Sequence, residues 1–296
     1  MDFDVLILGC GPAGLQAGIH AARKKVKVGI VGHPDRSAIN KAHVENYFGV
    51  EGKVDGEKLL ATGIQQAEKF GAKIVRSDVV GSGKDGELFV LTTEDDEVLK
   101  AKSLIMAMGV SRAKLNVEGE KEFLGKGVSY CTACDCGFFR GKKVAIVGNE
   151  STAASSAMLM TEYASAVYWV TNETKVAGPL MEKLKKTSVR IIASWPAKIV
   201  GNEVVQGLVL ADGSRLEVDG VFIELGAKGA IDLAFDLGVV PQPDGSIKVN
   251  EKMETEAPGL FACGDVTGEP WQLARAVGQG CIAGNNAAKF VKKEAY

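Results

Sequence analysis

The sequence predicts an α/β fold in which two units of the nucleotide-binding type follow one another along the chain. An apolar segment at 3–8 leads into the glycine-rich turn Gly9–Gly14, which opens a helical pattern. A second strand–turn–helix–strand pattern begins at Lys143. The C-terminal segment adds another glycine turn, at Gly264, before a long helix. These three observations predict two Rossmann-like three-layer nucleotide-binding domains.

The first unit has the order of elements that a dinucleotide site requires. Short apolar runs indicate buried strands, and segments with a helical period lie between them. The expected strands are 3–8, 26–31, 72–78, 86–93 and 96–102, the last two antiparallel, and the expected helices are 15–24 and 57–70.

The second unit repeats that order. We expect a strand over 144–147, a turn over 148–152, a helix over 153–163 and a strand over 166–170. A C-terminal helix over about 272–289 completes the first unit instead of the second.

The first domain is therefore expected to be discontinuous and to consist of 1–112 plus 240–296. The second unit lies in an inserted domain, 113–239. No Pro- or Ser-rich linker marks the joins, so these boundaries depend on the pattern of elements alone.

Composition and charge exclude several classes of partner. A formal net charge of −2 gives no whole-protein electrostatic reason to bind nucleic acid or a membrane surface. No apolar run approaches the roughly 18 residues that a membrane helix requires. Six cysteines, three of them between Cys131 and Cys136, fit a catalytic dithiol in a reducing compartment better than a disulfide scaffold. We therefore expect a cytoplasmic protein.

The first glycine turn has the spacing of a dinucleotide-binding loop. Gly9 permits a tight turn, Gly11 lets the backbone approach a pyrophosphate, and Gly14 allows the helix to pack closely on the strand. Pro12 and Ala13 lie at the helix N-terminus, whose free N–H groups favour phosphate. A glycine-rich turn without a ligand is the alternative, and the flanking strand and helix argue against it.

One expected part of this site is missing. An acidic residue normally ends the second strand and holds the ribose hydroxyls, but this chain has His33 after Val31 and Gly32. We expect backbone groups and the polar stretch 35–37 to hold the adenosine end instead.

Cys131 and Cys134 have the spacing of a redox dithiol, and Asp135 follows them directly. Two thiols separated by two residues can close a small disulfide ring, and an adjacent carboxyl group can deliver a proton. Zinc would need two more ligands at comparable spacing, so we expect no metal site. Cys136 is either a packing residue or a third redox thiol. Cys10, Cys263 and Cys281 are expected to be small hydrophobic residues.

Four motifs now stand in a known order: Gly9–Gly14, Val44–Gly49, the CxxCD motif at 131–135 and Gly264–Val266. Over its whole length the chain resembles the low-molecular-weight thioredoxin reductases, which have the two-dinucleotide-binding flavoprotein fold. The resemblance implies an FAD in the discontinuous domain, the dithiol in the inserted domain, thioredoxin as a partner, and a homodimer.

The resemblance also implies roles for individual residues. Cys131 would attack the disulfide of thioredoxin, Cys134 would exchange electrons with the flavin, and Asp135 would assist proton transfer. The FAD contacts implied are Gly9, Gly11, Pro12, Ala13 and Gly14 at the pyrophosphate, Asn46 near the flavin, Gly264 and Asp265 at the ribityl chain, and the backbone of Gln272, Leu273 and Ala274 at the flavin pyrimidine.

The second nucleotide unit departs from the family pattern in two places. Glu150 stands where an NADPH-binding turn has the glycine that admits the pyrophosphate, and its carboxylate would repel phosphate. Residues 171–173 read Thr-Asn-Glu where the family has His-Arg-Arg to grip the 2′-phosphate. We therefore do not expect NADPH to bind.

This departure resembles the pyridine-nucleotide-independent flavin thioredoxin reductases, which take electrons from ferredoxin or from deazaflavin F420. We expect ferredoxin as the donor. The basic cluster 23–27, with Arg36 and Lys41, is a candidate docking patch for an acidic ferredoxin. Trp271 either covers the flavin ring or packs.

Three alternatives stay open at this point. The first is a thioredoxin reductase that takes electrons from F420H2. The second is an FAD-dependent dithiol oxidase that passes electrons to O2. The third is a redox-sensing FAD protein without turnover, against which the complete dithiol and its adjacent acid argue.

Overall fold

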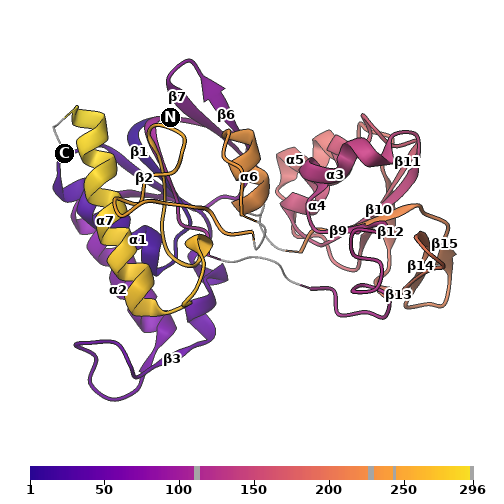
Figure 1. The fold of residues 1–296 in the computed structure, drawn as a ribbon, viewed down its shortest axis with the longest axis horizontal. Coiled ribbons are helices and arrows are strands. Elements are labelled where there is room, and N and C mark those ends of the chain that lie inside the picture. The colour runs from indigo at the N-terminus through magenta and orange to yellow at the C-terminus, as the bar shows by residue number, and fades with distance from the viewer. Residues whose placement is uncertain (110–113, 226–229, 243–244, 294–296) are drawn as a thin grey trace. The chain divides into compact units, whose positions relative to one another are not determined.

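The computed structural model describes residues 1–109, 114–225, 230–242 and 245–293, and the side chains of 41, 133, 134 and 230–232 lie outside that description. The chain divides into two compact units (Figure 1). The first consists of Met1–Thr93, Glu97–Val110 and Leu233–Tyr296, and the second of Glu94–Asp96 and Ser111–Asp232. The predicted boundaries 1–112, 113–239 and 240–296 stay a prediction, from which this division differs at 94–96, 111–112 and 233–239.

The first unit is built on a seven-stranded sheet in the order β5-β2-β1-β8-β7-β6, with β17 paired to β8. Strands β5, β2, β1, β8 and β17 run parallel, and β7 pairs antiparallel with both β6 and β8. The strands are β1 (Asp2–Leu8), β2 (Val28–Val31), β5 (Lys73–Val75), β6 (Val79–Asp85), β7 (Leu88–Thr93), β8 (Val98–Met106) and β17 (Leu260–Ala262).

Helices α1 (Pro12–Arg23), α2 (Gly56–Lys69) and α7 (Leu273–Lys292) belong to the same unit. Helix α1 begins before the predicted residue 15 because Pro12 occupies its first turn, where a fixed φ suits the helix and no N–H is lost. The remaining elements are the short ribbon β3 (His43–Val44) and β4 (Val54–Asp55), helix α6 (Ala230–Asp236), and the 3-10 turns Pro34–Arg36, Ala38–Lys41 and Asp265–Thr267.

The second unit repeats the layered design with a parallel sheet in the order β12-β11-β10-β16-β9. A three-stranded antiparallel sheet, β13-β14-β15, accompanies it. Its strands are β9 (Val128–Ser129), β10 (Lys143–Val147), β11 (Ala166–Thr171), β12 (Arg190–Ala193), β13 (Pro196–Gly201), β14 (Val205–Leu210), β15 (Arg215–Leu216) and β16 (Gly220–Ile223). Its helices are α3 (Thr132–Asp135), α4 (Ser151–Met160) and α5 (Gly178–Leu184), with a 3-10 turn at Cys136–Phe139.

Strand β6 is an element that the sequence pattern did not predict. It begins at Val79, directly after the single strand that was expected over 72–78. Its sequence VVGSGKD combines two glycines with polar residues. Such residues have low β-propensity. The pairing with β7 forms it, and that pairing is not visible in a local pattern.

Helices α1 and α7 pack backbone against backbone. A Cβ atom at Gly280 would lie 2.3 Å from the carbonyl oxygen of Ala13, and one at Gly284 would lie 2.2 Å from that of Ala17. Figure 1 shows α7 running alongside α1. The C-terminal segment is therefore held against the helix that follows the first glycine turn.

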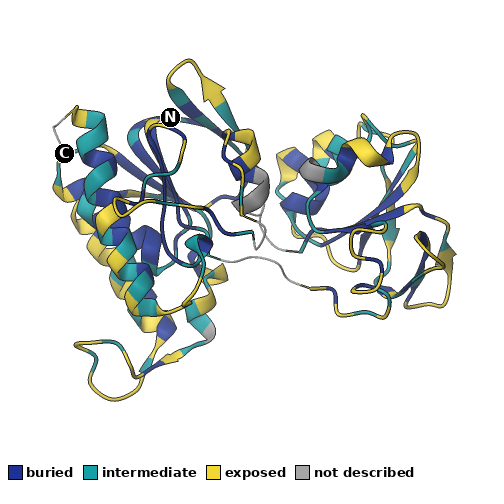
Figure 2. Ribbon diagram, in the orientation of Figure 1, coloured by how far each residue is buried: buried dark blue, intermediate teal, exposed yellow. Residues whose placement is uncertain are grey.

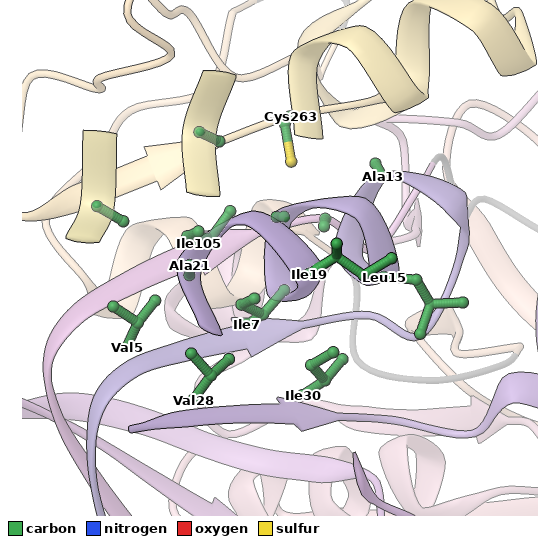
Figure 3. Close-up of a cluster of buried hydrophobic side chains, with 14 of the residues drawn as sticks. Val5, Ile7, Ala13, Leu15, Ile19, Ala21, Val28, Ile30, Ile105 and Cys263 are labelled. Carbon is green, nitrogen blue, oxygen red and sulfur yellow. The ribbon is translucent and has the colours of Figure 1, made fainter. Parts of the chain in front are cut away.

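The core of the first unit joins residues from both ends of the chain. Cys10 and Cys263 lie in it with the aliphatic residues of β1, β2 and α1 (Figure 3). Burial raises the pKa of both thiols to about 12, partly offset at Cys10 by Arg76. Figure 2 shows buried residues in the central strands and exposed residues on the outer faces of the helices. Of the helices within the described ranges, none is long and apolar enough to cross a membrane.

Replacing Gly280 by Ala is expected to lower the free energy of unfolding by about 1–3 kcal/mol, because the new methyl group would overlap the Ala13 carbonyl. Gly278→Ala is the matched control on the same helix, since nothing lies within 4 Å of a Cβ there. Its expected effect is neutral or a gain of up to about 1 kcal/mol from helix propensity. Urea unfolding followed by circular dichroism measures both, and equal losses in the two variants would contradict the close packing.

Iodoacetamide at pH 8 is expected to leave Cys10 and Cys263 unmodified in the folded protein. With a pKa of about 12, roughly one thiol in ten thousand is ionised at that pH, and the thiolate is the reactive form. Mass spectrometry of the peptides gives the labelling rates, with a urea-unfolded sample as the control. Native labelling as fast as in urea would show that these thiols are not core residues.

Candidate cofactor and dithiol sites

The glycines of the first turn have two different structural roles. A Cβ at Gly9 would lie 2.3 Å from the carbonyl oxygen of Ala107, and one at Gly14 would lie 1.9 Å from that of Gly9, so both permit close packing. At Gly11 the single atom within 4 Å of such a Cβ is Ser37 Oγ, at 3.3 Å. The backbone at Gly11 therefore faces open space beside Ser37.

The N-terminus of α1 suits an anion. Gly11 is the N-cap residue, no side chain caps the helix, and its first turn, which contains Pro12 and Ala13, holds no acidic residue. The positive end of the helix dipole is not neutralised by the protein itself. The open backbone at Gly11 and the uncapped N-terminus of α1 together fit a pyrophosphate.

The structure shows which polar groups stand where the ribose-binding acid is missing. Arg36 forms an ion pair with Asp78, whose side chain is only 4% exposed, and Nε2 of His33 lies 3.9 Å from the same carboxylate. Ser37 lies beside Gly11. The sequence analysis missed Asp78, and the signal for it was a charged residue at the end of the predicted strand 72–78.

Several cations of the predicted basic docking patch contact other side chains of the protein. Arg36 is committed to Asp78, and Lys41 lies outside the described side chains. The guanidinium of Arg23 lies 5.6 Å from the centroid of the Phe70 ring. The ammonium group of Lys27 lies 5.4 Å from the centroid of the Phe3 ring. Arg23, Lys27 and Arg36, three cations of the patch, therefore make side-chain contacts within the first unit.

The C-terminal part of the site meets the first turn at Gly264. This glycine has φ 79°, and a Cβ on it would lie 2.8 Å from the Cβ of Ala13. Burial raises the pKa of the adjacent Asp265, and the nearby Arg275 lowers it in part. A half-buried carboxyl group here fits a hydroxyl ligand such as the ribityl chain.

Two side chains of α7 hold the loop that carries Asp265. Gln279 accepts hydrogen bonds from the Gly264 amide (2.8 Å) and from Thr267 Oγ1 (3.0 Å). Arg275 donates to the carbonyl oxygen of Gly268 (2.6 Å) and to Thr267 Oγ1 (2.9 Å). The sequence analysis did not single out these residues, although their spacing of four places them on one face of a helix.

Asn46 and Gln272 come together from distant parts of the chain. Nδ2 of Asn46 lies 3.5 Å from Oε1 of Gln272. Gln272 is the N-cap residue of α7, which has no capping side chain and no acid in the first turn that contains Leu273 and Ala274. Trp271 is 56% exposed, which favours a covering role over packing. The start of α7 thus offers N–H groups to a ligand that carries negative charge.

All FAD-contact residues expected from the sequence therefore lie within one unit. The open backbone at Gly11, the half-buried Asp265 and the uncapped start of α7 fit the pyrophosphate, the ribityl chain and the flavin pyrimidine, in that order. When bound, FAD supplies the capacity to accept and release electrons.

In the second unit, Cys131 is disulfide-bonded and Cys136 is not. Cys10, Cys263 and Cys281 of the first unit form no disulfide either. The Cys131 amide donates to Ser129 Oγ (3.0 Å), and the carbonyl oxygen of Cys131 accepts from the Asp135 amide (3.3 Å). The side chain of Cys134 lies outside the described part, so its pairing with Cys131 stays a prediction.

Cys136 forms no disulfide and is buried. Its side chain raises the pKa of Tyr163, through its charge when ionised and through a hydrogen bond. This contact favours the packing role for Cys136.

The second nucleotide unit places carboxylates where phosphates would bind. Glu150 is the N-cap residue of α4, and Glu173 pairs with Lys175 at 3.1 Å. Thr171 Oγ1 donates to Asn149 (2.8 Å), and the Lys175 amide donates to the carbonyl oxygen of Asn149 (2.8 Å). The turn therefore closes on itself. Lys175 is a cation that the sequence analysis did not anticipate, and Glu173 offsets its charge.

Comparison with known proteins agrees with this geometry. The family model described as pyridine nucleotide-disulphide oxidoreductase matches residues 3–280. The thioredoxin reductase of Aquifex aeolicus is 36% identical over 98% of this chain and 93% of its own length.

Two solved structures are similar over 99% of both chains. The atypical thioredoxin reductase TRi from Desulfovibrio vulgaris Hildenborough has a TM-score of 0.86 at 32% identity. A ferredoxin-flavin thioredoxin reductase from Clostridium acetobutylicum has a TM-score of 0.70 at 34% identity. The chain thus belongs to the pyridine nucleotide-disulphide oxidoreductase family, as a thioredoxin reductase-type, FAD-dependent flavoprotein disulfide oxidoreductase.

Proposed function

We propose that the protein reduces the disulfide of a thioredoxin-like protein through Cys131 and Cys134, with electrons that reach FAD from ferredoxin and not from NADPH. The observation that carries the choice of donor is Glu150 at the N-cap of α4. That position is where the pyrophosphate of a nucleotide would meet the helix N-terminus.

The cost of placing a phosphate there is large. Two like unit charges 4 Å apart repel by about 4 kcal/mol at an effective dielectric constant of 20. This corresponds to about a thousandfold loss of affinity. Glu173 adds a second negative charge, and its partner Lys175 only balances it. The 2′-phosphate of NADPH therefore has no net positive charge to meet in this turn.

The comparisons support ferredoxin as one donor used by similar proteins. One similar structure is that of a ferredoxin-flavin thioredoxin reductase. Other relatives carry only the name thioredoxin reductase, which specifies no donor. The preference for ferredoxin thus depends on the carboxylates of the second unit. A cytoplasmic location and a homodimer stay predictions.

The chain's own residues have separate tasks in this reaction. Cys131, fixed by Ser129, is the sulfur that attacks the partner disulfide, and Cys134 resolves the mixed disulfide. Asp135, whose amide is held by the Cys131 carbonyl, delivers a proton to one of the two sulfurs. Asp265 and the first turn of α7 orient the cofactor in the other unit.

Anaerobic bleaching of the flavin tests the donor. Reduced ferredoxin is expected to bleach the flavin within seconds and to support thioredoxin reduction. NADPH and NADH are expected to be at least a hundredfold slower, because the second unit repels their phosphates. Absorbance at 450 nm follows the flavin. Faster bleaching by F420H2 than by ferredoxin would favour the deazaflavin donor, and rapid bleaching by NADPH would refute the argument from Glu150.

Replacing Cys131 by Ser is expected to abolish thioredoxin reduction, because the sulfur that attacks the disulfide of thioredoxin is then missing. Flavin reduction by the donor should continue at the wild-type rate. Cys136→Ser is the matched control, since Cys136 is not part of a disulfide and is expected to have a packing role, and it should keep most of the turnover. Turnover by the Cys131 variant would show that the dithiol has been assigned wrongly.

A further inference from the structure

A buried carboxylate lies directly beneath the redox loop, defined as residues 131–135. Glu224 follows the last residue of β16, and its side chain is 5% exposed. Its backbone amide donates to the carbonyl oxygen of Val147, which ties it to the end of β10. The C-terminal ends of parallel strands are where α/β proteins place functional groups. No role has so far been given to this residue.

Three donors converge on one oxygen of Glu224. Oε1 accepts hydrogen bonds from the backbone amide of Thr132 (3.1 Å), from the hydroxyl of Thr132, and from Ser156 Oγ (3.1 Å). Thr132 is the residue that follows Cys131, so these bonds fix the backbone between the two cysteines of the CxxC motif. Ser156 belongs to α4 and adds a contact outside the redox loop.

Positioning of the redox loop does not by itself require a negative charge on Glu224. A neutral glutamine would accept the same hydrogen bonds, whereas burying a carboxylate costs several kcal/mol unless donors and partners compensate it. A negative charge next to a dithiol has a chemical effect that an amide lacks, because it disfavours the thiolate form of a nearby cysteine.

We propose that Glu224 is a positioning residue of the redox loop and that its negative charge shifts the dithiol–disulfide equilibrium towards the disulfide. The inference rests on the proposed role of Cys131 and Cys134 as the redox dithiol. Reduction of that disulfide takes two electrons from reduced FAD and one proton, breaks the S–S bond and forms one thiol and one thiolate. The thiolate, which attacks the next disulfide, places a second negative charge near Glu224 and so makes the reduced form less favourable. Disfavouring the reduced form makes the dithiol a stronger reductant for its acceptor.

The described elements around Glu224 carry few charged side chains. The redox loop contributes Cys131, Cys134 and Asp135, and its residue Thr132 donates to Glu224. Helix α4 carries no charged side chain, nor do β9 and β11. Lys143 lies at the opposite end of β10 from Val147. Glu150 adds a negative charge at the N-terminus of α4.

The test compares Glu224→Gln with the wild type in a dithiol redox buffer. Alkylation and mass spectrometry of the Cys131 peptide give the fraction reduced. We expect the equilibrium constant to shift towards the dithiol by about tenfold, equivalent to about 30 mV. The pH midpoint for alkylation of the reduced loop should fall by about one unit, because the thiolate is no longer repelled. Glu203→Gln, at an exposed position of the same unit, is the matched control and should show neither shift.

A second pair of variants keeps the proposal testable if Glu224→Gln does not fold. Thr132→Ser retains the hydroxyl donor and should match the wild type, whereas Thr132→Val removes it and should slow thioredoxin reduction at least threefold. An unchanged equilibrium and pH midpoint in Glu224→Gln, or equal turnover in the two Thr132 variants, would overturn the role of Glu224. Turnover in Cys131→Ser would instead overturn the dithiol itself, so the two failures are distinguishable.

Discussion

The backbone contact between α1 and α7 is the constraint on which the first unit depends. Gly280 and Gly284 bring the two helices close enough that any side chain would overlap the carbonyls of Ala13 and Ala17. This contact holds the C-terminal segment against the turn at residue 9. Asp265, Gln272 and the pyrophosphate turn can therefore serve one cofactor although more than 250 residues separate them along the chain. Glycine is required because only the absence of Cβ permits so short a separation.

The second unit keeps the architecture of a nucleotide-binding domain and uses its strand ends differently. A Cβ at Gly148 would lie 2.0 Å from the carbonyl oxygen of Glu224. The glycine of this turn therefore makes room for the protein's own backbone. Glu150 occupies the helix N-terminus, and the Glu224 side chain accepts hydrogen bonds from the redox loop. The sheet edge that would bind a nucleotide positions a disulfide instead.

Charge placement separates the two units by function. In the first unit the helix N-termini at α1 and α7 carry no capping acid, which suits an anionic cofactor. In the second unit carboxylates stand at the corresponding edge of the sheet. Two domains of one design thus differ in the charge at their helix N-termini, because Glu150 stands at the start of α4 whereas α1 and α7 have no acid in their first turn.

The sequence by itself determined the two strand–turn–helix units, the FAD turn and the position of the CxxC motif, because local spacing and hydrophobic period carry that information. It also predicted, from Glu150 and Glu173, that NADPH does not bind, and this stays a prediction. Only the tertiary structure revealed the Arg36–Asp78 pair, the Arg275 and Gln279 clamp on the Asp265 loop, strand β6, and the carboxylate of Glu224 beneath Thr132. Each of these depends on a partner distant in sequence or on helix geometry, and a single chain pattern does not encode which distant groups meet in a folded core.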